Sequence, residues 1–287
     1  MVTQKALKSQ AVSIPPRSVG TELHVALSEM ANGTVDETRI LAASMEWAAP
    51  LDLCGLRALI EFAALHVGEV FVDCPSNLNV NNYLERMSLY DDLPSNVSLS
   101  RDRPHLSTNA SEKLIELRRV NSTESVESVV DAVQRAAYYT LGRNKVAKAC
   151  GTAVAAAAEN VLDHSESPIG AFIAAQTYRG TGLELACVDL GLGIPATLRR
   201  RSEYSHLGDA AVIQKALEDG VTSAQRDDQG RGAGLADLCK TVRRAGHSTL
   251  TIQSGHANVS VSNNINPQVT TPRVAFIGTW ISIRLQP

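Results

Sequence analysis

Aromatic residues are scarce in this sequence, at 4% of 287 residues, whereas the apolar fraction is 44%. The cores must therefore be built mainly from Ala, Val, Leu and Ile, which suits close packing of helices on a sheet. An excess of either charge is also lacking, because 27 basic and 30 acidic residues leave a formal charge of −3. A nucleic-acid partner would need a basic footprint, and the sequence shows none.

Paired cysteines and long apolar runs are missing as well. The five cysteines are scattered singly, with no CxxC pair and no histidine at metal-ligand spacing. This is typical of reduced, mostly buried thiols in a cytosolic protein. Met1–Gln10 lacks the apolar core of a signal peptide, and no run of about 18 uncharged apolar residues occurs. These absences favour a cytoplasmic protein with no membrane partner.

A polar, turn-rich stretch between Leu93 and Ser111 interrupts the periodic patterns of the chain. We therefore predict three parts, which are a small α/β domain over residues 1–94, a linker over 95–110 and a larger domain over 111–287.

Strand and helix patterns alternate in both predicted domains, which indicates an α/β (α+β) protein. In the small domain, Glu22–Leu27 alternates like a strand, residues 51–65 have helical spacing, and Glu69–Cys74 is a short apolar strand. The larger domain has predicted helices over Glu124–Leu141, Val146–Asp163, Asp209–Glu218 and Leu235–Ala245, and predicted strands that include Leu183–Val188, Thr249–Gln253 and Phe276–Arg284.

The first candidate motif is Asp189-Leu190-Gly191-Leu192-Gly193-Ile194-Pro195, which directly follows a predicted strand. Its two glycines allow the main chain to turn tightly after the carboxylate. The carboxylate of Asp189 can accept a hydrogen bond from an exocyclic amine, which adenine has and guanine lacks at the equivalent position. Alone the pattern is weak, because strand-ending Asp-Gly turns are common.

The second motif is Gly230-Arg231-Gly232-Ala233-Gly234-Leu235, which opens a predicted helix. The amides of alternating glycines can face an anion, and the helix start adds the positive end of its dipole. No GxxxxGK[ST] occurs, and the GxGxxG spacing of a dinucleotide site is absent. A surface loop is the alternative for this motif taken alone.

The third motif is Glu159-Asn160-Val161-Leu162-Asp163-His164, near the end of a predicted helix. Asn160 and His164 are four residues apart and are therefore expected on one helix face. A carboxamide oxygen there can coordinate Mg²⁺, and an imidazole can lie near phosphates. Taken alone, such residues are usually capping or solvated.

The order of these motifs, followed by a strand with Gly278-Thr279, resembles the GHKL ATPase superfamily of histidine kinases, type II topoisomerases and anti-sigma-factor serine kinases. The resemblance covers roughly residues 110–287, and the N-x-x-x-H form looks closest to the anti-sigma and chemotaxis kinase branches. It implies a Bergerat-type ATP-binding fold, in which a mixed sheet covered by helices forms a two-layer sandwich. It also implies ATP and Mg²⁺ as ligands, with Mg²⁺ on Asn160 and the adenine amine on Asp189. The other nucleotide-binding positions that it implies are His164, Gly191, Gly193, Ile194, Gly230, Gly232, Gly234, Leu235 and Thr279.

One position departs from the family pattern. In several branches the residue four before the Mg²⁺-binding Asn is a Glu or His that serves as general base, and here it is Ala156. Alanine accepts no proton, and Glu159 is rotated by about 100° from Asn160 around a helix. The sequence therefore supports ATP binding better than hydrolysis or phosphoryl transfer.

The small domain resembles anti-sigma-antagonist (STAS-type) domains at Asp52-Leu53-Cys54-Gly55-Leu56, which an apolar helix and a short strand follow. In that family a serine in this signature is phosphorylated by the partner kinase. Cys54 occupies that place here, so the usual phosphoacceptor is missing. An ordinary α/β domain with a buried Cys54 is the alternative.

Two functional hypotheses follow, and either is compatible with a homodimer. In the first, the chain is a Mg·ATP-dependent regulator that phosphorylates a protein partner, although Ala156 counts against it. In the second, ATP binds without catalysis and orders Pro195–Gly230 as a lid that gates a partner surface. A histidine sensor kinase would need a phosphoacceptor His in the helix over Glu124–Leu141, which has none. An α/β interaction protein whose glycine loops bind nothing is the remaining alternative.

Overall fold

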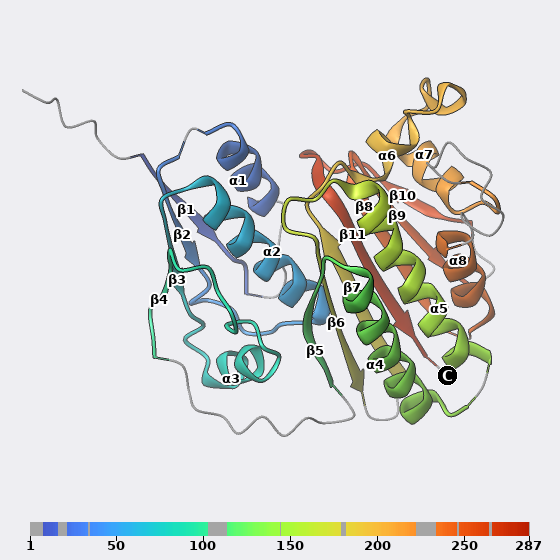
Figure 1. Ribbon diagram of the computed structural model, residues 1–287, viewed down its shortest axis with the longest axis horizontal. Coiled ribbons are helices and arrows are strands. Elements are labelled where there is room, and N and C mark those ends of the chain that lie inside the picture. The colour runs from blue at the N-terminus through green and yellow to red at the C-terminus, as the bar shows by residue number, and fades with distance from the viewer. Residues whose placement is uncertain are drawn as a thin grey trace, which may run out of the picture.

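The computed structural model describes residues 8–16, 22–33, 35–102, 114–143, 145–178, 182–221, 234–245, 247–263 and 266–286. Within them the chain forms two β-sheets with helices packed around them (Figure 1). The smaller sheet is parallel and the larger one is antiparallel, which is the α+β organisation expected from the sequence. None of the helices in these stretches is long and apolar enough to cross a membrane.

The small sheet has the strand order β1-β2-β3-β4, and every neighbouring pair is parallel. Parallel neighbours require crossover connections, and helices supply them here. The elements are β1 (Ser9–Ser13), α1 (Glu22–Ala31), β2 (Glu37–Leu41), α2 (Pro50–His66), β3 (Glu69–Asp73), α3 (Leu78–Arg86) and β4 (Val97–Leu99).

Two features of this half differ from the sequence-based expectation. Residues 22–27, expected as a strand, begin α1, because buried His24, Leu27 and Met30 recur at helical spacing. The predicted linker over 95–110 contains β4, which pairs with β3, so the small sheet extends past residue 94. Residues 103–113 lie outside the described part of the chain.

The large sheet has the order β10-β9-β8-β11-β7-β6-β5. All of its neighbouring strands pair antiparallel, whereas a mixed sheet was expected. Its strands are β5 (Leu114–Val120), β6 (Ala171–Tyr178), β7 (Gly182–Asp189), β8 (Thr249–Gly255), β9 (Ala257–Ser262), β10 (Gln268–Thr270) and β11 (Phe276–Leu285). Its helical elements are α4 (Thr123–Leu141), α5 (Lys145–Asn160), the π-turn η1 (Val161–Ser165), α6 (Gly193–Leu198), the 3₁₀ turn η2 (Ser202–Tyr204), α7 (Asp209–Ala216) and α8 (Gly234–Arg244).

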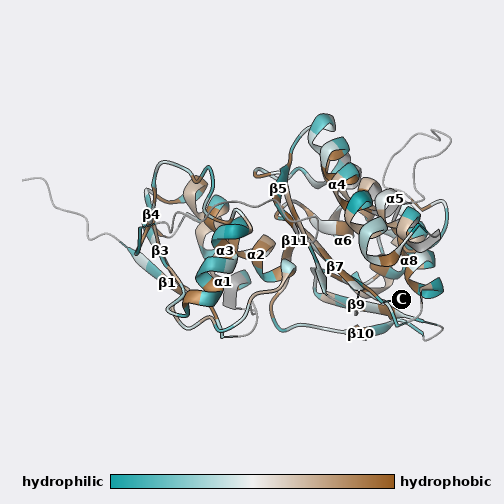
Figure 2. Ribbon diagram, turned by 90° about the horizontal axis from the view of Figure 1, so that it is seen from below, coloured by the Kyte–Doolittle hydropathy of each residue, from teal (hydrophilic) through white to brown (hydrophobic). Residues whose placement is uncertain are grey.

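Both faces of the large sheet are covered. Alternate side chains such as Ile173 and Cys187 enter the core under α4, α5 and α8, and the residues between them, such as Phe172 and Ala186, enter a core shared with the small domain. On that second face α2 lies between the two sheets (Figure 2). The predicted two-layer sandwich therefore gains a third layer from the same chain.

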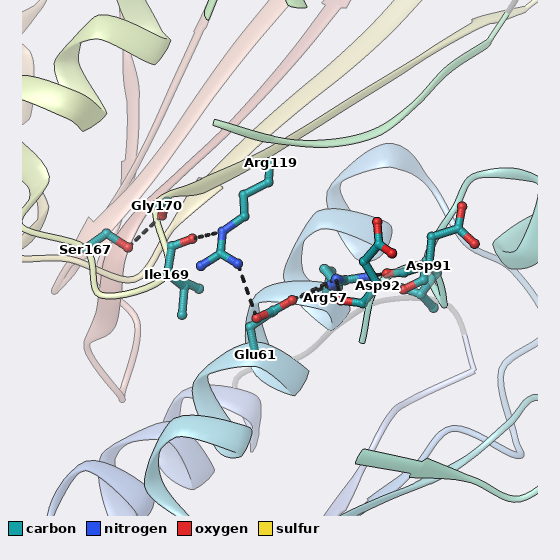
Figure 3. Close-up of polar contacts among 9 residues, drawn as sticks. Arg57, Glu61, Asp91, Asp92, Arg119, Ser167, Ile169 and Gly170 are labelled. Carbon is teal, nitrogen blue, oxygen red and sulfur yellow. Dashed lines mark hydrogen bonds and ion pairs between the residues drawn. The ribbon is translucent and has the colours of Figure 1, made fainter. Parts of the chain in front are cut away.

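A buried ion network joins the two halves beside α2 (Figure 3). Arg57 donates to Glu61 Oε1 from Nε and Nη2, at 3.0 and 2.7 Å, and both side chains are 7% exposed. The same guanidinium donates to the carbonyls of Leu89, Asp91 and Asp92. Arg119 of β5 lies 3.6 Å from Glu61 Oε2 and donates to Ile169 O at 2.9 Å. One carboxylate thus links α2 to the large sheet.

Candidate functional site

Asp189 and Thr279 lie side by side on neighbouring strands of the large sheet. Asp189 ends β7, Thr279 lies near the start of β11, and the antiparallel register pairs the two residues directly. The alternation that sends Cys187 and Ile281 into the core under α5 places both side chains on that face. Two residues that the sequence analysis assigned to one ligand are therefore neighbours.

The carboxyl group of Asp189 is buried, with 3% of the residue exposed. Its Oδ1 accepts the Gly191 N–H at 2.8 Å, and Thr279 lies directly opposite on β11. Burial raises the pKa of Asp189 from 3.8 to about 7, outweighing the stabilisation of the carboxylate by Gly191 and Thr279, which lowers the pKa. A buried carboxyl that titrates near neutrality is a frequent mark of a functional site.

The loop after β7 packs against the end of α5. The Leu192 N–H donates to Ser165 O at 2.7 Å, and a Cβ atom on Gly191 would overlap that same carbonyl. That Gly191 shapes a ligand pocket stays a prediction, and the structure shows a contact that also requires glycine at this position. This glycine lets the loop backbone touch the backbone of η1 at Ser165, the residue that directly follows the third sequence motif.

Ser254 of β8 is a site residue that the sequence analysis missed. Its hydroxyl donates to Gly278 O at 2.7 Å and accepts the Ile194 N–H at 3.1 Å, and the side chain is fully buried. Gly193, with a φ of +77°, and Gly278, with a φ of +73°, both occupy the left-handed region that favours glycine. A serine at the end of a strand gives no sequence signal of this role, because the bonds depend on tertiary pairing.

Gly191→Ala is expected to destabilise the protein by about 1–3 kcal/mol, because the new methyl group would force the loop away from η1. Gly68→Ala is the matched control, since a Cβ atom there would make ordinary contact with Asp36 O at 3.5 Å. Urea denaturation of both variants measures the difference. Equal midpoints for Gly191→Ala and wild type would contradict this packing.

Asn160 is the last residue of α5, and His164 lies in the π-turn that follows. The expectation that they share one face assumed α-helical spacing throughout, whereas a π-turn with i→i+5 bonds follows Asn160. His164 is half-buried, whereas the side chain of Asn160 lies outside what the structure describes. The bond from Leu192 to Ser165 places this helix end at the edge of the sheet that carries Asp189.

Of the second motif, Gly230 and Gly232 lie outside the described residues. Gly234 begins α8, and Leu235 is half-buried against the core. α8 ends shortly before Thr249, which pairs with Arg284. Arg284 lies at the opposite end of β11 from Thr279. The N-terminal end of α8 therefore points toward the Asp189 edge.

Part of the predicted lid over Pro195–Gly230 is firmly packed. Buried Ile194, Val212 and Ile213 belong to the core under α6 and α7. Asp209 pairs with Arg199 and accepts the His256 N–H, which anchors this segment to the hairpin between β8 and β9. The packed part extends to Val221, which contacts the core, and residues 222–230 of the predicted lid lie outside the described residues.

A cavity of about 310 Å³ lies beside the other ends of the central strands β7 and β11 of the large sheet. It is lined by residues from the start of β7, the end of β11 and the small domain, among them Trp47, Gly182, Leu183, Glu184, Arg284 and Gln286. Because β7 runs from Gly182 to Asp189, this cavity is separated from Asp189 by the length of the strand.

No protein-family model matches the sequence, and no curated protein matches it. Among solved structures, 56% of the chain aligns with 94% of the mycobacterial sensor histidine kinase MprB, at 20% identity and a TM-score of 0.29. A chain of the SiaB-SiaC complex from Pseudomonas aeruginosa aligns over 91% of its length with 61% of this chain, at 13% identity and a TM-score of 0.31. TM-scores this low identify neither a family nor a function.

Proposed function

We propose that this chain is a signalling regulator that binds Mg·ATP at the Asp189 edge of the large sheet, with the adenine amine on Asp189. The observation that supports the proposal best is the register that pairs Asp189 with Thr279. The DxGxG segment and the late Gly-Thr pair are far apart in sequence, yet the resemblance implies that both contribute to one adenine site. Here they form one buried polar cluster.

The chemistry of this cluster favours adenine over guanine. An ionised Asp189 carboxylate offers an acceptor to an exocyclic amine, whereas the carbonyl of guanine would face it with a second acceptor. Thr279 lies opposite this carboxyl group in the register of β11 and β7. Leaving a buried acceptor without its donor costs about 1–3 kcal/mol, which corresponds to a preference for adenine of about 5- to 150-fold.

Mg²⁺ fits the donor set that the chain offers at this edge. The carboxamide oxygen of Asn160 is a hard ligand of the kind that Mg²⁺ takes together with phosphates and water. Among the residues that the structure describes, no cluster of three or more His, Cys, Asp or Glu side chains could hold a metal alone. Asn160 would therefore orient a cation that arrives with the nucleotide, neutralising phosphate charge.

We favour binding without turnover over phosphoryl transfer to a partner. Ala156 occupies the position of the general base, and it can neither accept a proton nor orient an attacking hydroxyl group. In this form of the proposal the nucleotide gates the contact with a regulatory protein partner. Transfer to a serine or threonine of that partner is the competing form, and measurement of ADP separates the two.

The test is a calorimetric titration of the protein with ATP and with GTP at pH 6 and pH 8, in buffers of different ionisation enthalpy. ATP should bind in preference to GTP, and its affinity should fall about tenfold per pH unit below the Asp189 pKa of about 7. The amine requires the ionised carboxylate, so binding at pH 6 should release about one proton. At pH 8 the carboxylate is already ionised and hardly any proton should be released.

Two controls complete this titration. Asn160→Ala should remove the dependence on Mg²⁺ and leave the binding of free ATP, since the change touches only the cation. ADP should not accumulate in the same samples if the chain binds without turnover. The proposal fails if ATP does not bind at millimolar concentration, or if ATP and GTP bind equally with no proton release.

A further inference from the structure

β11 carries an irregularity where it enters the candidate adenine site. Phe276 pairs with Gly255 of β8 and Trp280 pairs with Gln253, so β11 has extra residues between these two pairs. Gly278 lies inside this bulge in the left-handed conformation, directly before Thr279. Bulged residues lose their regular ladder partners, and other groups must then satisfy the exposed backbone.

Side chains from three elements satisfy that backbone. The Ile277 N–H donates to His24 Nδ1 of α1 at 3.4 Å, and Trp280 Nε1 donates to Ile277 O at 3.0 Å. Ser254 donates to Gly278 O from the other side of the strand. The conformation of the segment before Thr279 therefore depends on a residue of the small domain.

His24 is suited to this contact by its surroundings. It is 2% exposed, and its ring packs edge-on against Phe276 and Trp280, with ring centres 4.4 and 4.9 Å apart. Burial lowers the pKa of His24 to about 4, so the imidazole is neutral and one ring nitrogen can accept.

α2 contacts Trp280, the residue of β11 that follows Thr279. A Cβ atom on Gly55 would overlap the ring of Trp280, so this glycine lets the helix and the indole touch. Trp280 belongs to the core shared with the small domain, while Thr279 faces the opposite side of the strand toward Asp189. Contacts from the small domain thus fix the residues on both sides of Gly278-Thr279.

We infer that the small domain completes the adenine subsite, with His24 as a positioning residue for Thr279; this rests on the function proposed above. The site is then built from both halves of the chain, although the ligand touches one. His24 acts through the Ile277 main chain, and the Gly55–Trp280 contact keeps the bulge against the sheet. Loosening either contact would let Thr279 move away from the Asp189 carboxyl group.

The test replaces His24 by Ala and by Asn, whose side-chain oxygen can reach nearly the same place as Nδ1. His24→Ala should weaken ATP binding about tenfold, the equivalent of one lost hydrogen bond. It should also raise the hydrogen-exchange rate of the Ile277 amide by a similar factor. His24→Asn should restore part of both. Val25→Ala on the same helix, at a residue 41% exposed, should change neither.

The two readouts separate this inference from the proposed function. If the wild type binds no ATP, the proposed function fails, and exchange at Ile277 still tests whether His24 holds the bulge. If ATP binds and His24→Ala alters neither affinity nor exchange, the inference is overturned while the proposed function stands. If His24→Ala does not fold, His24→Asn and the exchange measurement decide, because a working acceptor should keep Ile277 protected.

Discussion

Replacing Asp189 by Asn is expected to stabilise the unliganded protein at pH 8 while removing its preference for ATP. Burial raises the folded-state pKa of Asp189 from 3.8 to about 7, so between these values the folded protein keeps a proton that the unfolded chain has lost. The wild type therefore loses stability as the pH rises through this window. Asparagine carries no such charge and escapes the loss.

The expected size of this stabilisation follows from the same shift in the pKa of Asp189. A rise of about three pKa units corresponds to on the order of 4 kcal/mol, which is the upper limit of the gain for Asp189→Asn at pH 8. Near pH 4 the wild-type carboxyl group is neutral in the folded state, and the two proteins should have almost equal stability. Thermal denaturation at pH 4 and pH 8 measures the difference, and a stabilisation that does not depend on pH would contradict the buried charge.

The effect of Asp189→Asn on binding depends on the Gly191 hydrogen bond. Because Oδ1 accepts the Gly191 N–H, an asparagine in that place keeps its oxygen there and presents its NH₂ group to the ligand. The adenine amine then meets a donor, and ATP affinity should fall by about 10- to 100-fold. A 6-oxo purine nucleotide such as ITP should bind the variant better than ATP does. Unchanged ATP affinity would place the adenine elsewhere.

Arg57→Met is expected to cost about 3–5 kcal/mol of the free energy of unfolding. The guanidinium is buried and compensates Glu61, which is also buried, and it donates to three main-chain carbonyls. Methionine would fill much of the volume and leave the carboxylate, among the residues that the structure describes, with Arg119 at 3.6 Å as its charged partner. Urea denaturation at pH 7 measures the loss.

A second substitution tests whether the stability lost in Arg57→Met comes from the unpaired Glu61 carboxylate. Arg57→Met with Glu61→Leu removes the stranded carboxylate and should recover part of the loss, because two apolar side chains replace an ion pair. Arg118→Met changes an exposed arginine of β5 and should stay within about 0.5 kcal/mol of the wild type. A cost below about 1 kcal/mol for Arg57→Met would mean that Glu61 has another partner or is solvated.

The sequence predicted the parts of the site that lie within single motifs. Asp189 at a strand end, the tight glycine turns and the strand with Thr279 are local patterns, and the structure has them. That Asn160 and His164 share one face stays a prediction, because a π-turn follows Asn160 and the side chain of Asn160 lies outside what the structure describes. Residues 22–27 were wrongly predicted as a strand, because so short a window fits both the two-residue period of a strand and the 3.6-residue period of a helix.

The other parts of the site depend on tertiary contacts, which no local sequence pattern encodes. Ser254 reaches Ile194 across 60 residues, and the contact from Ile277 to His24 spans 253. The Asp52-x-Cys54-Gly55 signature lies on α2, which packs against the large sheet. Cys54 is fully buried there, 3.8 Å from Ala186 O, and burial raises its thiol pKa well above the usual range.

The coverage of the large sheet on both faces also sets the folding unit. Phe172, Val188 and Trp280 share a core with α1 and α2, so residues 114–286 folded alone would present an apolar sheet face to water. Such a fragment would associate through that face. The two sheets, which a domain map would separate, should therefore melt in a single cooperative transition.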